Sequence, residues 1–302
     1  MNAVLAPERL PTTWPAPYDG MVVSEADYWA AYYLGHDVTY EWNDGILEEK
    51  GVSDYLTFRM YDWFIQLLTE FLRVHPIADR VGLEMGFRLA LPGKAVIRRP
   101  DYGVVRYDNP VPLTDLEQSY RGIFDLCIEG VSTSSKAMQE RDTVVKKSEY
   151  AQGGVREYYL LHHSPQLRQF YRLNASGVYE PMPVGSGDVA QSGVLPGFQW
   201  RLRDLERRPP LQALIDDPVY AGYVLRSLQQ ERQAKEQERQ ARLAAEQRVA
   251  QEQQARLVAE QRAEQEQQAR LVAEQRAEQE QHAAQQEVER LRALLRQAGM
   301  EP

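Results

Sequence analysis

The chain has 302 residues, of which 43% are apolar and 26% are charged, and it contains one cysteine. This composition is typical of a globular protein with one large domain or two, and it excludes collagen-like, disulfide-rich and wholly disordered chains. The formal net charge of −9 argues against a surface that binds polyanions tightly by itself. It does not exclude a site where carboxylates hold a metal ion that meets phosphate.

The N-terminal residues and the hydropathy pattern predict where the protein resides. No stretch approaches the 18 consecutive apolar residues of a membrane-spanning helix, and residues 1–20 have prolines and an acid where a signal peptide needs a basic start and an apolar run. We therefore expect a cytoplasmic protein without membrane contact, and a flexible arm over residues 1–20. Cys127 lies in the apolar run FDLCIEG and is expected to be a small core residue.

Residues 21–208 alternate short apolar segments with turn signals, which predicts one domain of mixed helices and strands. A capped amphipathic helix is expected to follow Ser24, and the segments VTYEW and ILEEK flank Asp44-Gly45 as a β-hairpin. The further expected elements are helices at about 53–74 and 137–152, and strands near 81–91, 95–98, 102–107, 123–129, 156–162, 166–173 and 177–180. The fold class is therefore α/β or α+β, with a central mixed sheet flanked by helices.

The C-terminal quarter has a different composition. After an expected linker at 209–225, residues 226–298 contain no glycine, proline or aromatic residue, and a 14-residue block, two heptads long, repeats within them. The acids and bases of this tail nearly balance, so the acidic excess belongs mainly to residues 1–230. One interpretation is a solvated helical stalk. The other is a coiled coil that makes the protein a homo-oligomer, although most heptads lack an apolar pair.

Two carboxylates stand at the ends of expected strands. Asp101 opens an apolar strand, and Glu129 closes another. Adjacent strands can bring such residues together at one edge of a sheet, where paired oxygen ligands suit Mg²⁺ or Mn²⁺. The alternative interpretation is that both acids are simply solvated.

The expected helix at 137–152 adds a cation. Asp142, Lys146 and Tyr150 are four residues apart and therefore share one face of the helix. A lysine on that face can lie near the carboxylates and orient a water molecule, whereas the alternative is an Asp142–Lys146 surface pair of small energetic value. His162-His163 end an expected strand, and the sequence shows no metal partner for them, so we interpret them as strand-end residues.

These segments together resemble the Uma-two family of putative restriction endonucleases, within the PD-(D/E)XK nuclease superfamily. The resemblance covers about residues 40–200. The segments that carry it are Tyr40-Glu41-Trp-Asn-Asp44-Gly45, Arg99-Pro100-Asp101, Phe-Asp-Leu-Cys-Ile-Glu129-Gly-Val-Ser132, Lys146-x-x-x-Tyr150-Ala151-x-x-Gly154-Val155-x-Glu157-Tyr158-Tyr159 and Leu195-Pro196-Gly197.

The resemblance implies a restriction-endonuclease-like core and a Mg²⁺-dependent (or Mn²⁺-dependent) endonuclease that hydrolyses DNA. It implies that Asp101 and Glu129 bind the metal, with a backbone carbonyl beside Glu129 as a further ligand. Lys146 would be the superfamily lysine, moved from the strand to the following helix, and Glu41 would complete the acidic cluster. DNA affinity is then expected to be weak without a divalent ion.

A second hypothesis belongs to another class. The segment between Glu129 and Asp142 is longer than the family pattern, which favours a catalytically inactive nuclease-fold protein whose helical tail assembles partners. The intact set of Asp101, Glu129 and Lys146 favours the enzyme. The two hypotheses differ in whether the protein cleaves DNA when a divalent ion is supplied.

Overall fold

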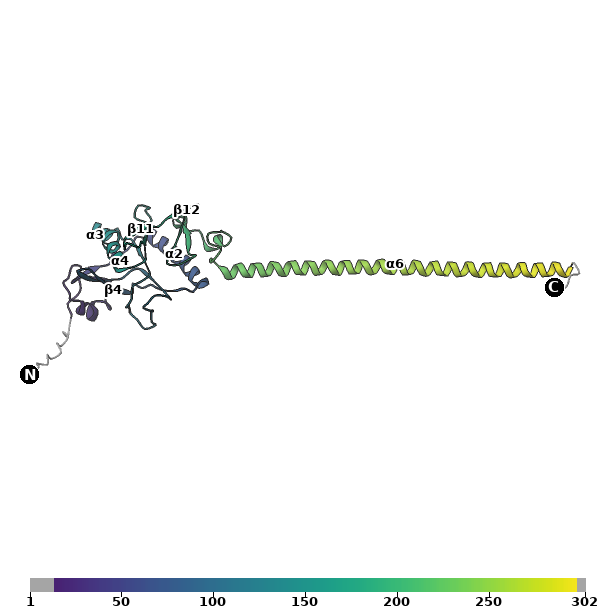
Figure 1. Cartoon of the computed structure of the whole chain (residues 1–302), viewed down its shortest axis with the longest axis horizontal. Coiled ribbons are helices and arrows are strands. Elements are labelled where there is room, and N and C mark those ends of the chain that lie inside the picture. The colour runs from purple at the N-terminus through teal and green to yellow at the C-terminus, as the bar shows by residue number, and fades with distance from the viewer. Residues whose placement is uncertain (1–13, 298–302) are drawn as a thin grey trace, which may run out of the picture. The chain divides into compact units, whose positions relative to one another are not determined.

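A computed structural model describes residues 14–297, so most of the expected arm at 1–20 lies outside the described residues. The chain divides into two compact units after Gln229. The first unit mixes helices with three sheets, and the second consists of the helix α6 beyond its first turn (Figure 1), which confirms the expected α+β class with a long C-terminal helix. Among the described helices, none combines the length and apolar character needed to cross a membrane.

The strands of the first unit form three sheets. The five-stranded sheet has the order β2-β1-β5-β4-β7, and the six-stranded sheet has the order β11-β10-β9-β8-β6-β3. Most neighbouring strands are antiparallel, but β8 with β9 and β4 with β7 are parallel, so both larger sheets are mixed. The strands are β1 (Tyr40–Asn43), β2 (Ile46–Glu49), β3 (Ala78–Val81), β4 (Gly86–Leu91), β5 (Lys94–Arg98), β6 (Tyr102–Arg106), β7 (Ser119–Tyr120), β8 (Leu126–Gly130), β9 (Glu157–Leu161), β10 (Gln169–Leu173), β11 (Tyr179–Pro181), β12 (Val184–Gly185), β13 (Val189–Gln191) and β14 (Gln199–Arg201).

The helices include the two that the sequence predicts beside the site. The side chain of Asp54 accepts hydrogen bonds from the first free backbone N–H groups of α2, which explains where this helix begins. The expected helix at 137–152 is present and contains one wide, π-helical stretch, η2. The helices are α1 (Glu25–Asp27), η1 (Tyr28–Tyr32), α2 (Tyr55–Val74), α3 (Lys136–Glu140), η2 (Arg141–Lys146), α4 (Lys147–Gly153), α5 (Leu202–Arg207), η3 (Leu211–Leu214) and α6 (Arg226–Gln297).

The predicted hairpin is confirmed as β1 and β2. Its turn residues Asp44 and Gly45 both have positive φ, 47° and 100°, which is the conformation that an Asp-Gly hairpin turn adopts. Glu41 on β1 alternates with Tyr40 and Trp42, which pack together in a small core below the hairpin. Glu41 therefore points to the opposite face, toward the rest of the domain.

The two faces of the six-stranded sheet belong to different cores. Helix α2 covers one face, where Leu126 and Ile128 of β8 are buried. Cys127 points to the other face and is buried in the core shared with β4, β5 and α4, as expected of a small core residue. Because side chains alternate along a strand, Glu129 shares the face of Cys127 and lies on the side of α4.

Three expectations need correction. The segment 81–91 forms two strands, because Leu83 and Glu84 adopt positive φ and make a turn between β3 and β4. The short strands β7, β12, β13 and β14 have no clear alternation in the sequence and were not predicted. The segment 209–225 is not an open linker, because Leu214, Tyr220 and Tyr223 are buried in the core that α2 covers.

The second unit is the continuous helix α6 from Gln230 onward, and its side chains are exposed throughout residues 230–296. Ion pairs one turn apart lie along it, such as Arg242 with Glu246 at 2.9 Å. The repeated Leu243, Leu257 and Leu271 are each about half exposed. The helix is therefore confirmed, and its pairing with a second copy stays a prediction.

Candidate active site

Strand register brings Asp101 and Glu129 to the same edge of the six-stranded sheet. The last pair of the antiparallel β6–β8 ladder is Tyr102 with Ile128, so the next position in register sets Asp101 opposite Glu129. The backbone N–H of Gly130 donates to Asp101 Oδ2 at 2.7 Å. The two acids therefore occupy neighbouring register positions at the ends of β6 and β8, and the carboxylate of Asp101 faces a cavity that residues of α2 also line.

Glu129 is buried and receives two donors from the helix that follows β8. Lys146 Nζ lies 3.1 Å from Glu129 Oε1, and the Tyr150 hydroxyl donates to the same oxygen at 3.0 Å. Lys146 and Tyr150 are four residues apart and face the strand together, as their spacing indicates. The wide stretch η2 contains Lys146, and such stretches occur often at functional sites.

Lys146 is the centre of a buried cluster of three acids. Its Nζ lies 3.2 Å from Glu41 Oε1 and 3.2 Å from Asp142 Oδ1, in addition to Glu129. All four side chains are nearly fully buried. The structure thus brings Glu41, Glu129 and Lys146 into direct contact, with Asp101 next to Glu129.

Burial and charge oppose each other in this cluster. Burial raises the pKa of Glu129 to about 8, although Lys146 and Lys50 act to lower it. Burial would also raise the pKa of Glu41, but the charges of Lys146 and Arg98 outweigh burial and lower this pKa to about 2. Burial would lower the pKa of Lys146, whereas Glu129, Glu41 and Asp142 raise it well above its usual value. Lys146 is therefore a permanent cation near neutral pH.

Glu41 is held by groups of the five-stranded sheet. The backbone N–H of Arg99 donates to Glu41 Oε1 at 2.8 Å, and Arg98 Nη1 donates to Oε2 at 3.1 Å. The guanidinium of Arg98 is fully buried and also binds Glu149 of α4 at 2.6 Å. Arg98 therefore fixes both the acid on β1 and the helix that carries Lys146.

Lys50 is a residue of the site that the sequence did not reveal. It follows β2 directly, and its buried Nζ lies 2.7 Å from Asp101 Oδ1, 2.7 Å from the Arg99 carbonyl and 3.5 Å from Glu84. Asp101 and Glu129 raise its pKa against the effect of burial. In the sequence it is the final lysine of a hairpin strand, which looks like an ordinary solvated residue. Only the register of the hairpin against β5 places it at Asp101.

A cavity of about 270 Å³ opens beside these residues. Its lining residues are Val52, Ser53, Thr57, Phe58, Tyr61, Glu84, Asp101 and Gly130. Asp101 is the predicted site residue that lines this cavity, whereas Glu129 and Lys146 are buried and are not among its lining residues. A substrate group in the cavity would meet Asp101 first.

The donor set fits a hard divalent cation. Asp101 and Glu129 offer carboxylate oxygens only, which suits Mg²⁺ or Mn²⁺. Glu129 has an elevated pKa because burial is incompletely compensated, so a bound cation would stabilise its ionised form. The further ligand that the resemblance implies is a backbone carbonyl beside Glu129, and the carbonyl of the adjacent Gly130 accepts a hydrogen bond from Ser53 Oγ at 2.6 Å. Among the described residues, the ammonium of Lys50 contacts Asp101 and the ammonium of Lys146 contacts Glu129.

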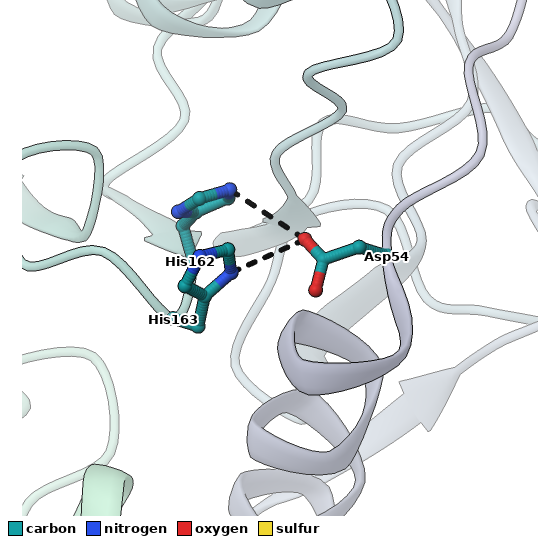
Figure 2. Close-up of side chains that lie close together, drawn as sticks. All are labelled: Asp54, His162 and His163. Carbon is teal, nitrogen blue, oxygen red and sulfur yellow. Dashed lines mark hydrogen bonds and ion pairs between the residues drawn. The ribbon is translucent and has the colours of Figure 1, made fainter.

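A separate trio combines an acid with the two strand-end histidines (Figure 2). Asp54 Oδ2 lies 3.7 Å from His162 Nε2 and 3.2 Å from His163 Nδ1. The ligand atoms of the trio lie within 4.8 Å of one another, which is close enough for a metal. However, the backbone N–H of Ser164 donates to His162 Nδ1 at 2.9 Å, so Nε2 carries the proton and faces Asp54. We therefore interpret Asp54 as the acceptor that caps α2, with His163 as its hydrogen-bond partner and His162 beside it.

Comparison with known proteins places the chain in a family. The family model Uma2, described as "Putative restriction endonuclease", matches residues 26–205. A crystal structure described as a putative nuclease belonging to DUF820, from Anabaena variabilis ATCC 29413, has a TM-score of 0.46 and 14% identity to this chain. The match covers 58% of this chain and 93% of that one. Among curated proteins, none matches.

The match spans more than half of the chain and contains all four predicted site residues. The resemblance noted in the sequence is thereby confirmed. The chain belongs to the Uma2 family, the family described as putative restriction endonucleases.

Proposed function

We propose that the protein is an endonuclease that hydrolyses phosphodiester bonds of DNA with the help of Mg²⁺ or Mn²⁺. Family membership supports nuclease activity in general. The observation that carries the proposal of metal-dependent DNA cleavage is the buried Lys146. Its Nζ lies within 3.2 Å of Glu129, Glu41 and Asp142, and Asp101, next in register to Glu129, lines the cavity. Such a cluster of charges in a desolvated place is characteristic of a functional site.

Each residue has a role that its surroundings support. Asp101 and Glu129 would hold the metal, which when bound supplies positive charge that stabilises the charge developing on the phosphate. Lys146 stays protonated and therefore acts as a fixed positive charge and hydrogen-bond donor rather than as a base. Glu41, kept ionised by Lys146 and Arg98, holds the ammonium of Lys146 in place.

Cleavage of DNA is the direct test of this proposal. Plasmid and oligonucleotide substrates are incubated with the full chain in Mg²⁺, in Mn²⁺ and in EDTA. Cleavage is expected with either ion and not with EDTA, and Lys146→Ala should reduce it by about a hundredfold or more. Lys147→Ala is the matched control, since the neighbouring Lys147 lies over the ring of Tyr171 outside the cluster. Equal cleavage by both variants would refute the role of Lys146.

The proposal extends to how DNA is bound. With a net charge of −9, the chain has few cations to spare for phosphates, so DNA affinity should be weak in EDTA. A divalent ion at Asp101 and Glu129 would add positive charge where the phosphate sits. Affinity should therefore rise when Ca²⁺, Mg²⁺ or Mn²⁺ is supplied.

One observation favours the second candidate, a catalytically inactive nuclease-fold protein. Lys50 Nζ lies 2.7 Å from Asp101 Oδ1, where a metal would bind, and so supplies a permanent internal cation. In that case the function would be carried by α6, which would form a coiled coil that assembles copies of the chain or other partners. A protein that binds Mn²⁺ at neither Asp101 nor Glu129 would support this alternative. A homo-oligomer held by α6 and a cytoplasmic location remain proposals for either candidate.

A further inference from the structure

The start of α2 and the segment before it carry apolar side chains that face solvent. The relative exposures are 81% for Val52, 71% for Tyr55, 48% for Leu56 and 53% for Phe58. We call these four residues the aromatic patch. Exposed apolar side chains gathered in one place indicate a binding surface more often than isolated ones do.

The patch is not part of the core. The buried face of α2 is already formed by residues farther along the helix, among them Met60, Phe64 and Leu67. Removing Tyr55 or Phe58 would therefore leave the packing of α2 on the six-stranded sheet intact. Two large rings therefore stay largely in water without contributing to the core.

The two rings of the patch lie nearly parallel to each other, beside an arginine. Tyr55 and Phe58 lie with their planes 21° apart and their centroids 6.4 Å apart. The guanidinium of Arg59 lies 5.9 Å from the centroid of the Tyr55 ring. Aromatic faces beside an arginine are the groups on which nucleobases stack.

The patch is continuous with the cavity of the candidate site. Val52 and Phe58 belong to the patch and also line the cavity that contains Asp101. A chain of nucleotides could therefore stack its bases on the rings while one of its phosphates reaches Asp101. This continuity distinguishes the patch from exposed apolar residues elsewhere, such as Leu116.

We propose that the aromatic patch binds unpaired bases, so that the preferred substrate is single-stranded or locally strand-separated nucleic acid. This inference rests on the proposed nuclease function. In a duplex, the faces of the bases are hidden in the stack and only their edges and the backbone are accessible. The acidic chain cannot derive much affinity from phosphates, whereas stacking needs no positive charge.

Binding of labelled oligonucleotides to the full chain tests the proposal. Fluorescence anisotropy compares a single strand of mixed sequence with its duplex, in Ca²⁺, for the wild type and the variants Tyr55→Ala, Phe58→Ala and Tyr55→Phe. The single strand should bind more tightly than the duplex, and each alanine variant should lose about tenfold in affinity. Tyr55→Phe keeps the ring and should bind like the wild type. Leu116→Ala is the matched control for loss of an exposed apolar side chain.

The outcomes separate this proposal from the proposed function. Tighter binding of the single strand that depends on Tyr55 and Phe58 supports the patch, whether or not the strand is then cleaved. Equal or tighter binding of the duplex, or unchanged affinity in both alanine variants, overturns it even if DNA is cleaved. Absence of any oligonucleotide binding, with the patch instead required for a protein partner, also overturns it.

Discussion

Glu129 is a buried acid whose charge is only partly compensated. It shares the Nζ of Lys146 with Glu41 and Asp142, and Glu41 has a second cation in Arg98. Burial raises the pKa of Glu129, whereas the charges of Lys146 and Arg98 lower the pKa of Glu41. Because the charge of Glu129 is incompletely neutralised, the site is suited to bind a further cation.

The pKa shifts predict how stability changes with pH. Because the pKa of Glu129 rises from 4.5 to about 8 on folding, the folded state holds the proton more tightly, and stability falls as pH rises through this window. The slope from this group is at most about 1.4 kcal/mol per pH unit. Glu129→Gln should lack this fall when urea unfolding is measured between pH 5 and pH 8. Parallel profiles for the wild type and the variant would contradict the assignment.

Glu41 contributes in the opposite direction and in another window. Its folded pKa of about 2 lies below the ordinary 4.5, so its stabilisation is present above pH 4.5 and is lost as pH falls toward 2. Glu41→Gln should therefore flatten the loss of stability in acid, while the profile above pH 5 keeps its shape. Urea unfolding at pH 3 and pH 6 measures this, and an unchanged acid limb would disprove it.

The position of Lys50 beside Asp101 predicts that its removal strengthens metal binding. Its ammonium lies 2.7 Å from Asp101 Oδ1 and repels any cation that approaches this oxygen. Lys50→Met should lower the dissociation constant for Mn²⁺ by about tenfold or more, measured by calorimetry. Lys94→Met is the control, since Lys94 pairs with Glu149 outside the cavity. Weaker Mn²⁺ binding in Lys50→Met would show that Lys50 supports the site rather than competing with the metal.

The candidate site was only partly predictable from single residues. Asp101, Glu129 and Lys146 could be found because strand ends and four-residue spacing are visible in the sequence. Lys50 could not, since its place depends on the register of the hairpin strand β1 against β5, which lies far along the chain. Asp54 was missed for the same reason, because its contact with His163 joins residues 109 positions apart.

At the scale of elements, close passage of two connections shapes the site. Gly51 leads from β2 to α2, and a Cβ there would lie 2.5 Å from Ser132 Oγ and 2.8 Å from Met138 Sδ. The glycine thus lets the segment with Lys50 and Ser53 lie against the segment that follows β8. Elements of strong periodicity, such as α2, were predicted well, whereas 81–91 was not, since its dividing turn uses Leu83 and Glu84 rather than glycine or proline.

Gly51→Ala is therefore expected to destabilise the domain. The added methyl must displace Ser132 or Met138, at a cost of about 1 to 3 kcal/mol, measured by urea unfolding. Gly222→Ala is the matched control, because nothing lies within 4 Å of a Cβ at that position. Similar stabilities for the two variants would show that the close passage is not needed.

At the scale of the whole molecule, the first unit should be independent of the tail. The side chain of Gln229 is buried and donates to the carbonyls of Ile215, Ala221 and Val224, so the unit extends into the first turn of α6. The sequence predicted the helix but not the buried contacts of Gln229, because nothing in the sequence distinguishes this glutamine from the many others in the tail. A truncation should therefore follow Gln230 rather than begin at Arg226.

Removal of the residues after Gln230 tests what the tail does. The truncated protein should keep the unfolding free energy of the domain, since the removed part of α6 is exposed along its described length. If α6 forms a coiled coil, light scattering should show a larger oligomer for the full chain than for the truncated one. Equal oligomeric states would leave α6 as a single solvated helix.

The central claim is that Asp101 and its neighbours form a metal-dependent nuclease site. Single-turnover cleavage of DNA in Mg²⁺ by Asp101→Asn measures this most directly, because asparagine keeps an oxygen that can accept from the Gly130 N–H. Asp62→Asn, on the exposed side of α2, is the control. We predict that Asp101→Asn loses cleavage by about a hundredfold or more while Asp62→Asn cleaves like the wild type. Wild-type cleavage by a folded Asp101→Asn protein would contradict the account.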